Sequence, residues 1–415
     1  MRYEIGKSKL EGQVKISGAK NSVLGLMAAS MLSSGVTTIE NVPNIYDVEN
    51  MIKIMERVGS EITTDWENHI LYIDNTYVNP DIEIGFSEIK ELRASYYLMG
   101  SLLGRFKKCC VSLPGGCVIG VRPINLHIKG FELLGADTVL DEGKIIATAE
   151  QGMHGAPIFF DFASVGATIN VMLAAVMAEG KTTLLNAAKE PHVIDIANML
   201  VAMGADIRCM GDRIIINGVK NLHPTRYMVV PDQIEAGTFL IAAAATKGEI
   251  EVLDVIPSHL DCITYKLEEI GCRIERKENS VICSAKDKSL IHTRISTAPY
   301  PGFPTDLQPQ MAVLLGLCKG TSIVCENVFE NRFLYVDEMT RLGGKMKVSS
   351  RTNVIYGVKH YSQAEVTAPD LRAGAALVIA CFNCGGIVGG TKHIERGYED
   401  FCGKFKNLNG LIDII

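Results

Sequence analysis

The chain has 415 residues, of which 47% are hydrophobic, and its formal net charge is -6 at pH 7. This length exceeds what one hydrophobic core usually supports, so we expect two domains. The negative charge argues against a nucleic-acid-binding protein, which needs a basic face to displace counterions. No apolar run approaches the roughly 18 uncharged residues of a membrane span, and the charged N-terminal segment has no hydrophobic signal region. We therefore expect a soluble cytoplasmic protein without a membrane partner.

One short sequence motif, an apolar residue followed by glycine or asparagine and then a strand-like segment, recurs along the chain. Its spacing of about 65–76 residues is longer than the 20 to 50 of solenoids and propellers. The repetition indicates one small structural unit used six times, or three times in each domain. The six copies begin at Val58, Leu134, Met203, Ile270, Leu342 and Leu408.

Each unit is expected to open with a helix of small residues, followed by a β-branched strand such as Thr37 to Asn41 or Thr182 to Asn186. An amphipathic helix such as Asp195 to Met203 comes next and ends at a glycine or asparagine, which suits a left-handed C-cap. Another strand follows. The opening helices are predicted at Lys20–Ser33, Arg93–Leu103, Gly166–Ala178, Glu235–Thr246, Leu307–Cys318 and Leu371–Phe382, several of them stopped by Gly35, Gly180, Gly248, Gly320 or Gly385.

The chain has twelve cysteines and no export signal, which predicts free thiols in a reducing compartment, most of them packed in the core. Cys381 and Cys384 have the CxxC spacing. They lie in an apolar stretch without a second pair or a histidine cluster to complete a zinc site, so no metal and no cofactor is expected.

Several cations stand near the predicted starts of the opening helices: Lys20 beside Asn21, Arg93, and Arg372 after Asp370. Unpaired backbone N–H groups and the positive end of the helix dipole are exposed at such positions. Each cation alone could equally be an ordinary solvated or salt-bridged side chain. Together, at matching places in several units, they favour a site for a polyanion. Loops between elements add Arg122, Arg332 and Arg396.

The segment from Leu113 to Pro123 contains three glycines, two prolines, Cys117 and Arg122. Glycines allow motion and close backbone approach, and a nearby guanidinium would favour the reactive thiolate of the cysteine. These features are typical of a lid with an activated thiol. The alternative is a surface turn with an inert cysteine.

Nine motifs, in order from end to end, closely resemble those of the UDP-N-acetylglucosamine 1-carboxyvinyltransferases, a family of enolpyruvyl transferases. The resemblance therefore covers essentially the whole chain. The motifs are Gly18–Asn21, Leu92–Ser95, Pro114–Cys117 with Arg122–Pro123, Ser164–Thr168, Ala188–Pro191, Pro304–Asp306, Glu330–Phe333, Asp370–Arg372 and Glu395–Tyr398.

The resemblance implies an α/β (α+β) fold of two domains, each with three βαβαββ units about a pseudo-threefold axis. It places residues 1–19 with 231–415 in the C-terminal-type domain, and residues 20–230, including the Cys117 loop, in the N-terminal-type domain. In this family the reaction takes place in the cleft between the domains.

The resemblance also implies the reaction. The enolpyruvyl group of phosphoenolpyruvate moves to the 3'-hydroxyl of UDP-N-acetylglucosamine by addition and elimination, and phosphate is released. This is the first committed step of peptidoglycan precursor synthesis, which serves cell wall biogenesis, cell shape and cell division, and the family is the target of fosfomycin. Cys117 matches the general acid and can also attack carbon 2, Asp306 matches the base, and Lys20 and Arg396 match further catalytic residues.

The implied ligand contacts fall into three groups. The phosphoenolpyruvate ligands are Lys20, Asn21, Arg122, Arg372 and Arg396. The UDP-N-acetylglucosamine contacts are Asn21, Arg93, Arg122, Pro123, Ile124, Asn125, Leu126, Ser164, Val165, Gly166, Asp306 and Val328. The supporting residues are Asp370, Glu190 and Arg332, and for Glu190 a structural role is equally compatible.

Two positions depart from the family pattern: Phe162 stands where some members place a lysine, and Gln233 where members often carry arginine. Both bear on nucleotide affinity more than on the chemistry. Two alternatives to the proposed reaction stay open, transfer to shikimate 3-phosphate and a non-catalytic paralogue that binds the nucleotide sugar. We expect small-molecule partners only, and a monomer or weak oligomer.

Overall fold

A computed structural model of the chain describes residues 1–85, 92–112, 119–120 and 123–415. The chain divides into two compact units, and each is described by itself. Unit 1 contains residues 1–17 and 231–415, with the described residues 119 and 120. Unit 2 contains the described parts of residues 18–230 other than these two. The predicted first boundary lies after residue 19, and the prediction assigns the whole Cys117 loop to unit 2. In unit 1, the backbone N–H of Asn331 donates to the carbonyl of Ile119 at 3.0 Å.

The described part of unit 2 forms three small sheets and their covering helices. In order of hydrogen-bonded neighbours, the sheets are β13 (Arg226–Met228), β3 (Val36–Glu40), β5 (Ile70–Asp74) and β4 (Glu61–Asp65); β6 (Lys108–Ser112), β8 (Lys144–Thr148) and β7 (Asp137–Asp141); and β11 (Asp206–Met210), β12 (Arg213–Asn217), β10 (Lys181–Leu185) and β9 (Pro157–Phe159). The helices are α1 (Lys20–Ser30), α2 (Tyr46–Arg57), the 3-10 helix η1 (Arg93–Tyr96), α4 (Tyr97–Phe106), α5 (Asn125–Leu133), α6 (Val165–Ala175) and α7 (Pro191–Ala202).

Unit 1 repeats the same plan. Its sheets are β15 (Arg273–Arg276), β16 (Ser280–Ser284), β14 (Glu249–Leu253) and β2 (Glu11–Lys15); β17 (Arg294–Ser296), β18 (Thr321–Cys325), β20 (Thr352–Tyr356) and β19 (Lys345–Ser349); and β21 (Ala364–Thr367), β22 (Gly386–Gly389), β1 (Arg2–Ile5) and β23 (Ile412–Ile414). The helices are α8 (Gln233–Ala245), η2 (Pro257–Leu260), α9 (Asp261–Glu269), η3 (Thr305–Leu307), α10 (Gln308–Leu315), α11 (Tyr335–Arg341), α12 (Leu371–Cys384), α13 (Lys392–Glu395) and α14 (Phe401–Asn407).

The strand pairing repeats from sheet to sheet. An edge strand runs parallel to its neighbour, as β2 does to β14 and β17 to β18, and an antiparallel pair completes the sheet. The N-terminal strands belong to unit 1, because β1 pairs with β22 and β23 while β2 pairs with β14. In the four-stranded sheets this is the arrangement that a βαβαββ unit produces.

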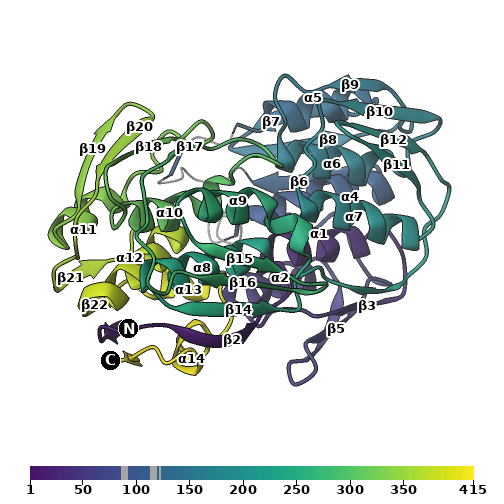
Figure 1. Cartoon of the computed structure of the whole chain (residues 1–415). Coiled ribbons are helices and arrows are strands. Elements are labelled where there is room, and N and C mark those ends of the chain that lie inside the picture. The colour runs from purple at the N-terminus through teal and green to yellow at the C-terminus, as the bar shows by residue number, and fades with distance from the viewer. Residues whose placement is uncertain (86–91, 113–118, 121–122) are drawn as a thin grey trace. The chain divides into compact units, whose positions relative to one another are not determined.

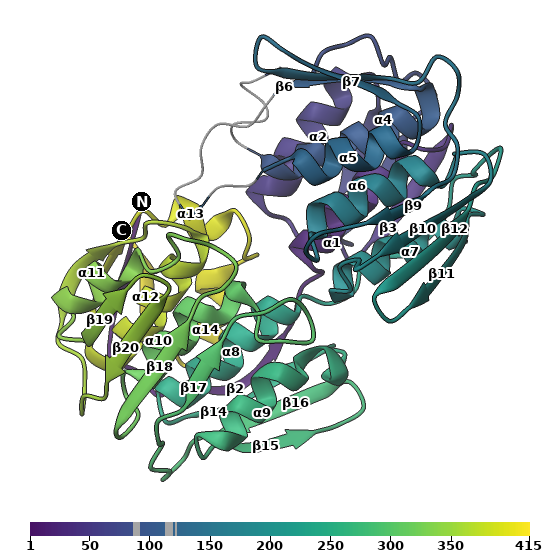
Figure 2. The same ribbon diagram turned by 90° about the horizontal axis from the view of Figure 1, so that it is seen from above.

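Each unit has its own hydrophobic core, with helices inside and small sheets outside (Figures 1 and 2). In unit 1, helices α8, α10 and α12 pack against one another. Their small residues permit close approach: a side chain added at Gly237 of α8 would come within 2.5 Å of Leu307. Helices buried on every side need no polar face, so the opening helices lack the amphipathic pattern of a surface helix.

The recurring sequence motif has the same backbone conformation in all six units. Its glycine or asparagine has a positive φ, which glycine adopts without strain and asparagine tolerates. The values are 100° at Gly59, 91° at Gly135, 104° at Gly204, 108° at Gly271, 78° at Gly343 and 64° at Asn409. The predicted left-handed helix ends are therefore confirmed.

Gly248, which follows helix α8, is needed for a reason other than a positive φ. The left-handed residue there is Lys247, with φ 57°, and Gly248 does not have a positive φ. A side chain at Gly248 would lie 1.8 Å from the carbonyl oxygen of Leu10, so close backbone packing requires glycine at this position.

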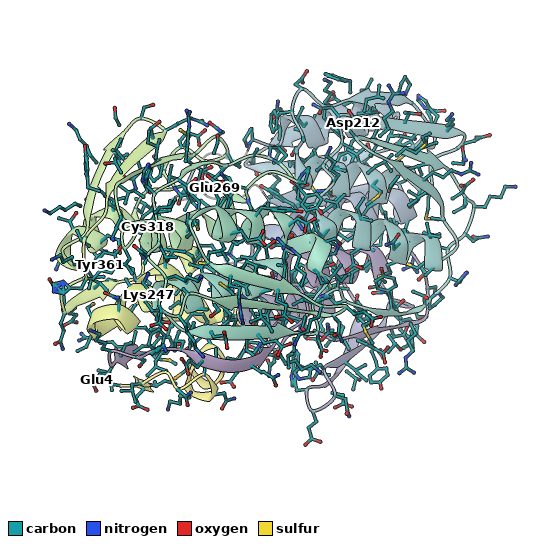
Figure 3. The ribbon with its side chains drawn as sticks, in the orientation of Figure 1. Glu4, Asp212, Lys247, Glu269, Cys318 and Tyr361 are labelled. Atoms are coloured by element: carbon teal, nitrogen blue, oxygen red, sulfur yellow. The ribbon has the colours of Figure 1, made fainter. Side chains whose placement is uncertain are left out.

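Eleven described cysteines are free, and six of them, including Cys318 in Figure 3, are buried. No helix in the described residues is both long and apolar enough to cross a membrane.

Candidate functional site

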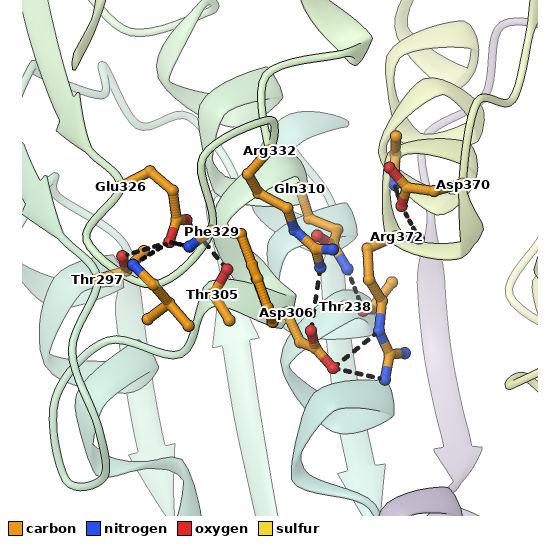
Figure 4. A network of polar contacts seen from close by, with 12 residues as sticks. Thr238, Thr297, Thr305, Asp306, Gln310, Glu326, Phe329, Arg332, Asp370 and Arg372 are labelled. Carbon is orange, nitrogen blue, oxygen red and sulfur yellow. Dashed lines mark hydrogen bonds and ion pairs between the residues drawn. The ribbon is translucent and has the colours of Figure 1, made fainter. Parts of the chain in front are cut away.

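Asp306 stands between two arginines in unit 1 (Figure 4). Nη2 of Arg332 donates to Oδ1 of Asp306 at 3.0 Å. Nε and Nη2 of Arg372 donate to Oδ2 at 3.3 and 3.1 Å, which is a forked contact. The arginine side chains are 2% and 4% exposed, whereas that of Asp306 is 28% exposed. The carboxylate therefore remains accessible while its two cationic partners are fixed by burial.

Helix α12 fixes the position of Arg372. Asp370 is the N-cap residue, and its Oδ1 accepts hydrogen bonds from the backbone N–H groups of Arg372 and Ala373 at 2.9 and 3.0 Å. The guanidinium carbon of Arg372 lies 5.3 Å from the ring centre of Tyr398. Burial would lower the pKa of Arg372, but the negative charge of Asp306 raises it above its usual range. Arg372 is thus a permanent cation at the start of a helix.

Several buried polar atoms around Asp306 have no hydrogen-bond partner within the described structure. They are Nε of Arg332, Nη1 of Arg372, Oδ2 of Asp370, and both side-chain polar atoms of Gln308. Burying such groups without partners is costly, so native structures usually satisfy them. The two guanidinium groups can still donate, as an anionic ligand requires.

Lys20 opens helix α1 in unit 2 and forms an ion pair with Asp47 at 2.5 Å. Both side chains are largely buried, at 13% and 3% exposure. Since the carboxylate compensates much of the lysine charge, Lys20 is held in one place. Helix α1 also packs against η1, which begins at Arg93.

Helices α5 and α6 of unit 2 pack together and bring a second group of predicted residues to their N-termini. Asn125 and Leu126 begin α5, directly after Pro123 and Ile124. Ser164 caps α6 by accepting from the N–H of Ala167 at 3.3 Å, and Val165 and Gly166 form its first turn. A side chain at Gly166 would meet His127 of α5 at 3.1 Å, so glycine allows the two helices to approach closely.

The structure thus unites Asp306, Arg332 and Arg372, with Asp370 at the cap of the same helix as Arg372. Val328 lies in the loop after β18, and Arg396 ends α13, both in unit 1. Glu190 precedes α7 in unit 2. Cys117 and Arg122 lie outside the described residues. Of the two departures, Phe162 is 54% exposed and Gln233 is the first residue of α8.

A buried carboxylate near this cluster, Glu326, is 0% exposed and is not among the predicted site residues. The residues of β18 alternate between exposed and buried in the structure, but the sequence does not show this, because the exposed position 323 is isoleucine and the buried position 322 is serine. Ser322 and Val324 face inward, and Glu326 continues that face of the strand. An acidic residue at an inward position indicates a specific polar role.

Comparisons with known proteins identify the family of the chain. A family model described as EPSP synthase (3-phosphoshikimate 1-carboxyvinyltransferase) matches residues 5–405. The UDP-N-acetylglucosamine 1-carboxyvinyltransferase of Clostridium botulinum is 49% identical over 98% of both chains. UDP-N-acetylglucosamine 1-carboxyvinyltransferase 2 of Bacillus subtilis is 45% identical over 98% of this chain and 95% of its own.

Solved structures share the fold. The enolpyruvyl transferase NikO from Streptomyces tendae superposes with a TM-score of 0.90 at 24% identity, covering 99% of this chain and 98% of its own. EPSP synthase from Acinetobacter baumannii gives a TM-score of 0.76 at 16% identity, with both chains fully covered. The predicted enolpyruvyl transferase fold is therefore confirmed. At the level of sequence, the chain belongs to the UDP-N-acetylglucosamine 1-carboxyvinyltransferase family.

Proposed function

We propose that this protein transfers the enolpyruvyl group of phosphoenolpyruvate to the 3'-hydroxyl of UDP-N-acetylglucosamine and releases phosphate. The observation that carries the proposal is the Asp306 cluster, an accessible carboxylate fixed by two buried arginines, in a chain of this family. The reaction needs a base beside bound anions, and this cluster provides both a carboxylate and cationic donors.

The addition step forms a bond between the 3'-oxygen of the sugar and carbon 2 of phosphoenolpyruvate. Asp306 accepts the hydroxyl proton, and carbon 3 gains a proton from Cys117, which lies outside the described residues. Elimination then returns a proton from carbon 3 to the Cys117 thiolate and breaks the bond from carbon 2 to the phosphate oxygen, so phosphate leaves with the electron pair and takes the proton held by Asp306. Arg332 and Arg372 fix the direction of the carboxylate that accepts the hydroxyl proton.

Phosphoenolpyruvate carries about three negative charges, so it requires several cations, and forked guanidinium donors suit its phosphate and carboxylate. We propose that Lys20, Arg122, Arg372 and Arg396 bind it, together with Asn21. Nη1 of Arg372, buried and without a hydrogen-bond partner in the described structure, is a donor for one of its oxygens.

We assign the nucleotide sugar to Asn21, Arg93 and Arg122, to the Pro123–Leu126 and Ser164–Gly166 segments, and to Asp306 and Val328. The N-termini of α5 and α6 favour its phosphates, because backbone N–H groups and the helix dipole both attract anions there. With these two small-molecule substrates, we infer that the protein acts in the cytoplasm.

One assay tests the proposal: inorganic phosphate release from phosphoenolpyruvate, measured with UDP-N-acetylglucosamine and with shikimate 3-phosphate in parallel. We expect phosphate release with UDP-N-acetylglucosamine and none with shikimate 3-phosphate. Release with shikimate 3-phosphate would assign the sister activity. Binding of the nucleotide sugar without release would indicate a non-catalytic paralogue.

The proton-donor assignment has its own test. Cys117→Ser should slow phosphate release by a factor on the order of 10²–10⁴, the usual contribution of a general acid, with little change in nucleotide-sugar affinity. In Cys117→Asp, a carboxylic acid can still deliver the proton, so activity should persist with its optimum at lower pH. A Ser variant with near-normal rates would remove Cys117 from this role.

A further inference from the structure

Glu326 of unit 1 is completely buried, and four neutral donors converge on its carboxylate. Oε1 accepts from the hydroxyl of Thr297 at 2.8 Å and from the backbone N–H groups of Val328 and Phe329 at 2.8 and 3.2 Å. Oε2 accepts from the hydroxyl of Thr305 at 3.0 Å. A buried carboxylate is tolerated when hydrogen bonds replace its hydration, as they do here.

These four bonds join segments that the chain brings from three places. Thr297 follows β17, Val328 and Phe329 follow β18, and Thr305 opens η3. Glu326 itself continues the inward face of β18. One side chain thus ties the turn that carries Asp306 to the loop that carries Val328 (Figure 4).

Glu326 reaches Asp306 along two routes. Thr305 is the residue directly before Asp306, so its hydroxyl bond fixes the turn from which the carboxylate projects. Phe329, held through its N–H, places its ring 5.8 Å from the guanidinium carbon of Arg332. Arg332 in turn binds Oδ1 of Asp306. Movement of Glu326 would therefore disturb both the base and one of its cations.

We propose that Glu326 is a positioning residue for the general base, and that it acts through Thr305 and through Phe329 with Arg332. The inference rests on the proposed function, because it assigns Asp306 as the base. Catalysis depends on alignment within a fraction of an ångström, and a misplacement of about 1 Å can cost roughly a hundredfold in rate.

The Thr305→Val variant isolates the first route. It is nearly isosteric and removes only the hydroxyl that binds Glu326. We expect kcat for phosphate release to fall about 10- to 100-fold, while KM for UDP-N-acetylglucosamine changes by less than about threefold. The matched control is Thr264→Val, which removes a buried hydroxyl that contacts Asp261 and Arg276 in the same unit. It should lose stability without a change in kcat.

Two substitutions of Glu326 separate hydrogen bonding from charge. In Glu326→Gln, the amide oxygen can keep the three donors of Oε1, and the amide nitrogen can donate to the hydroxyl of Thr305, which reverses its role. This variant should retain most of its kcat. Glu326→Ala leaves four donors without an acceptor, so kcat should fall and KM for the nucleotide sugar should rise, because the Val328 loop is also released.

The outcomes are distinct. A wild-type enzyme that releases no phosphate with UDP-N-acetylglucosamine overturns the proposed function, and this inference with it. An active wild type with an unchanged kcat in Thr305→Val, or with equal losses in Thr305→Val and Thr264→Val, overturns the positioning role alone. If Glu326→Ala does not fold, the Thr305→Val and Glu326→Gln pair still decides the question.

Discussion

Asp306 is bound more tightly than a solvent-exposed base would be. Among the described residues, two guanidinium groups donate three hydrogen bonds to it, and these arginines have little access to water. Burying these charges has an unfavourable desolvation free energy. The attraction between the opposite charges offsets it only when the geometry of the contacts is good. The gain is a carboxylate whose direction is fixed.

The Asp306→Asn variant tests this role. It removes the proton acceptor and directs an amide N–H at one of the arginines, so both catalysis and stability should suffer. We expect kcat to fall by a factor on the order of 10²–10⁴ and the free energy of unfolding to fall by about 1–3 kcal/mol. Phosphate release and urea unfolding measure the two effects. A kcat within threefold of the wild type would contradict the assignment.

His127 in α5 should make stability depend on pH. It is 6% exposed, and burial lowers its pKa to about 4. Oδ1 of Asn170 accepts from the N–H of Gly100 at 2.8 Å, so its Nδ2 is left to donate to Nδ1 of His127 at 2.9 Å. A protonated imidazole would place two donors face to face. The folded protein therefore prefers the neutral ring.

Because the folded pKa lies below the unfolded value of about 6.5, the unfolded state binds the proton first as pH falls. The stabilisation is complete above about pH 6.5 and is lost towards pH 4. We expect this one group to lower the free energy of unfolding by about 2 kcal/mol between pH 7 and pH 5. Urea unfolding of His127→Gln should show a correspondingly flatter dependence, whereas His223→Gln, at an exposed position, should behave as the wild type.

At the scale of elements, helix α12 combines a structural cap with a site residue. Oδ1 of Asp370 caps the helix, while its Oδ2 is buried and has no hydrogen-bond partner in the described structure. One carboxylate thus has a structural oxygen and a second oxygen that suits a ligand.

The Asp370→Asn variant separates these roles. Its amide oxygen can keep the cap, so the unfolding free energy should stay within about 0.5 kcal/mol of the wild type, whereas Asp370→Ala should lose about 1 kcal/mol. If Oδ2 serves the reaction, kcat for phosphate release should fall at least about tenfold in both variants, because a hydrogen bond to a charged group contributes about that much. Full activity in the stable Asn variant would restrict Asp370 to capping.

The elements themselves were largely predictable from sequence. The recurring glycine or asparagine requires a left-handed backbone, so its six positions fix the phase of the repeat. Helix starts were less certain: the helices predicted at Arg93 and Leu307 are preceded or opened by 3-10 turns. Such turns satisfy helix termini locally and leave no distinct pattern in the sequence.

The site was predictable only in part. Family motifs identified Asp306, Arg332 and Arg372 as candidates, but not that both arginines bind the same carboxylate, because these contacts join residues 26 and 66 positions apart. Asp47 as the partner of Lys20 and Glu326 as the anchor of Thr305 were also missed. A long-range contact between single polar side chains leaves no periodic pattern in the sequence. Such a contact therefore cannot be predicted from periodicity.

At the scale of the whole molecule, each unit has its own hydrophobic core. Two cores permit two unfolding steps, and the single tryptophan, Trp66, packs against the core of unit 2. Its fluorescence therefore reports unit 2, whereas far-ultraviolet circular dichroism reports the secondary structure of the complete chain. The two probes can separate the units without any labelling.

If both units supply contacts to one nucleotide sugar, its binding should stabilise both. Asn21 and Ser164 lie in unit 2, and Asp306 and Val328 lie in unit 1. A ligand at a hundred times its Kd adds about 2.7 kcal/mol, enough to raise the thermal midpoint of a unit of roughly 200 residues by about 5–11 °C. We expect UDP-N-acetylglucosamine to shift the Trp66 transition and the circular dichroism transition alike, and shikimate 3-phosphate to shift neither. A shift of the Trp66 transition together with only the part of the circular dichroism transition that unit 2 contributes would assign the nucleotide sugar to unit 2 alone and would remove Asp306 and Val328 from its contacts.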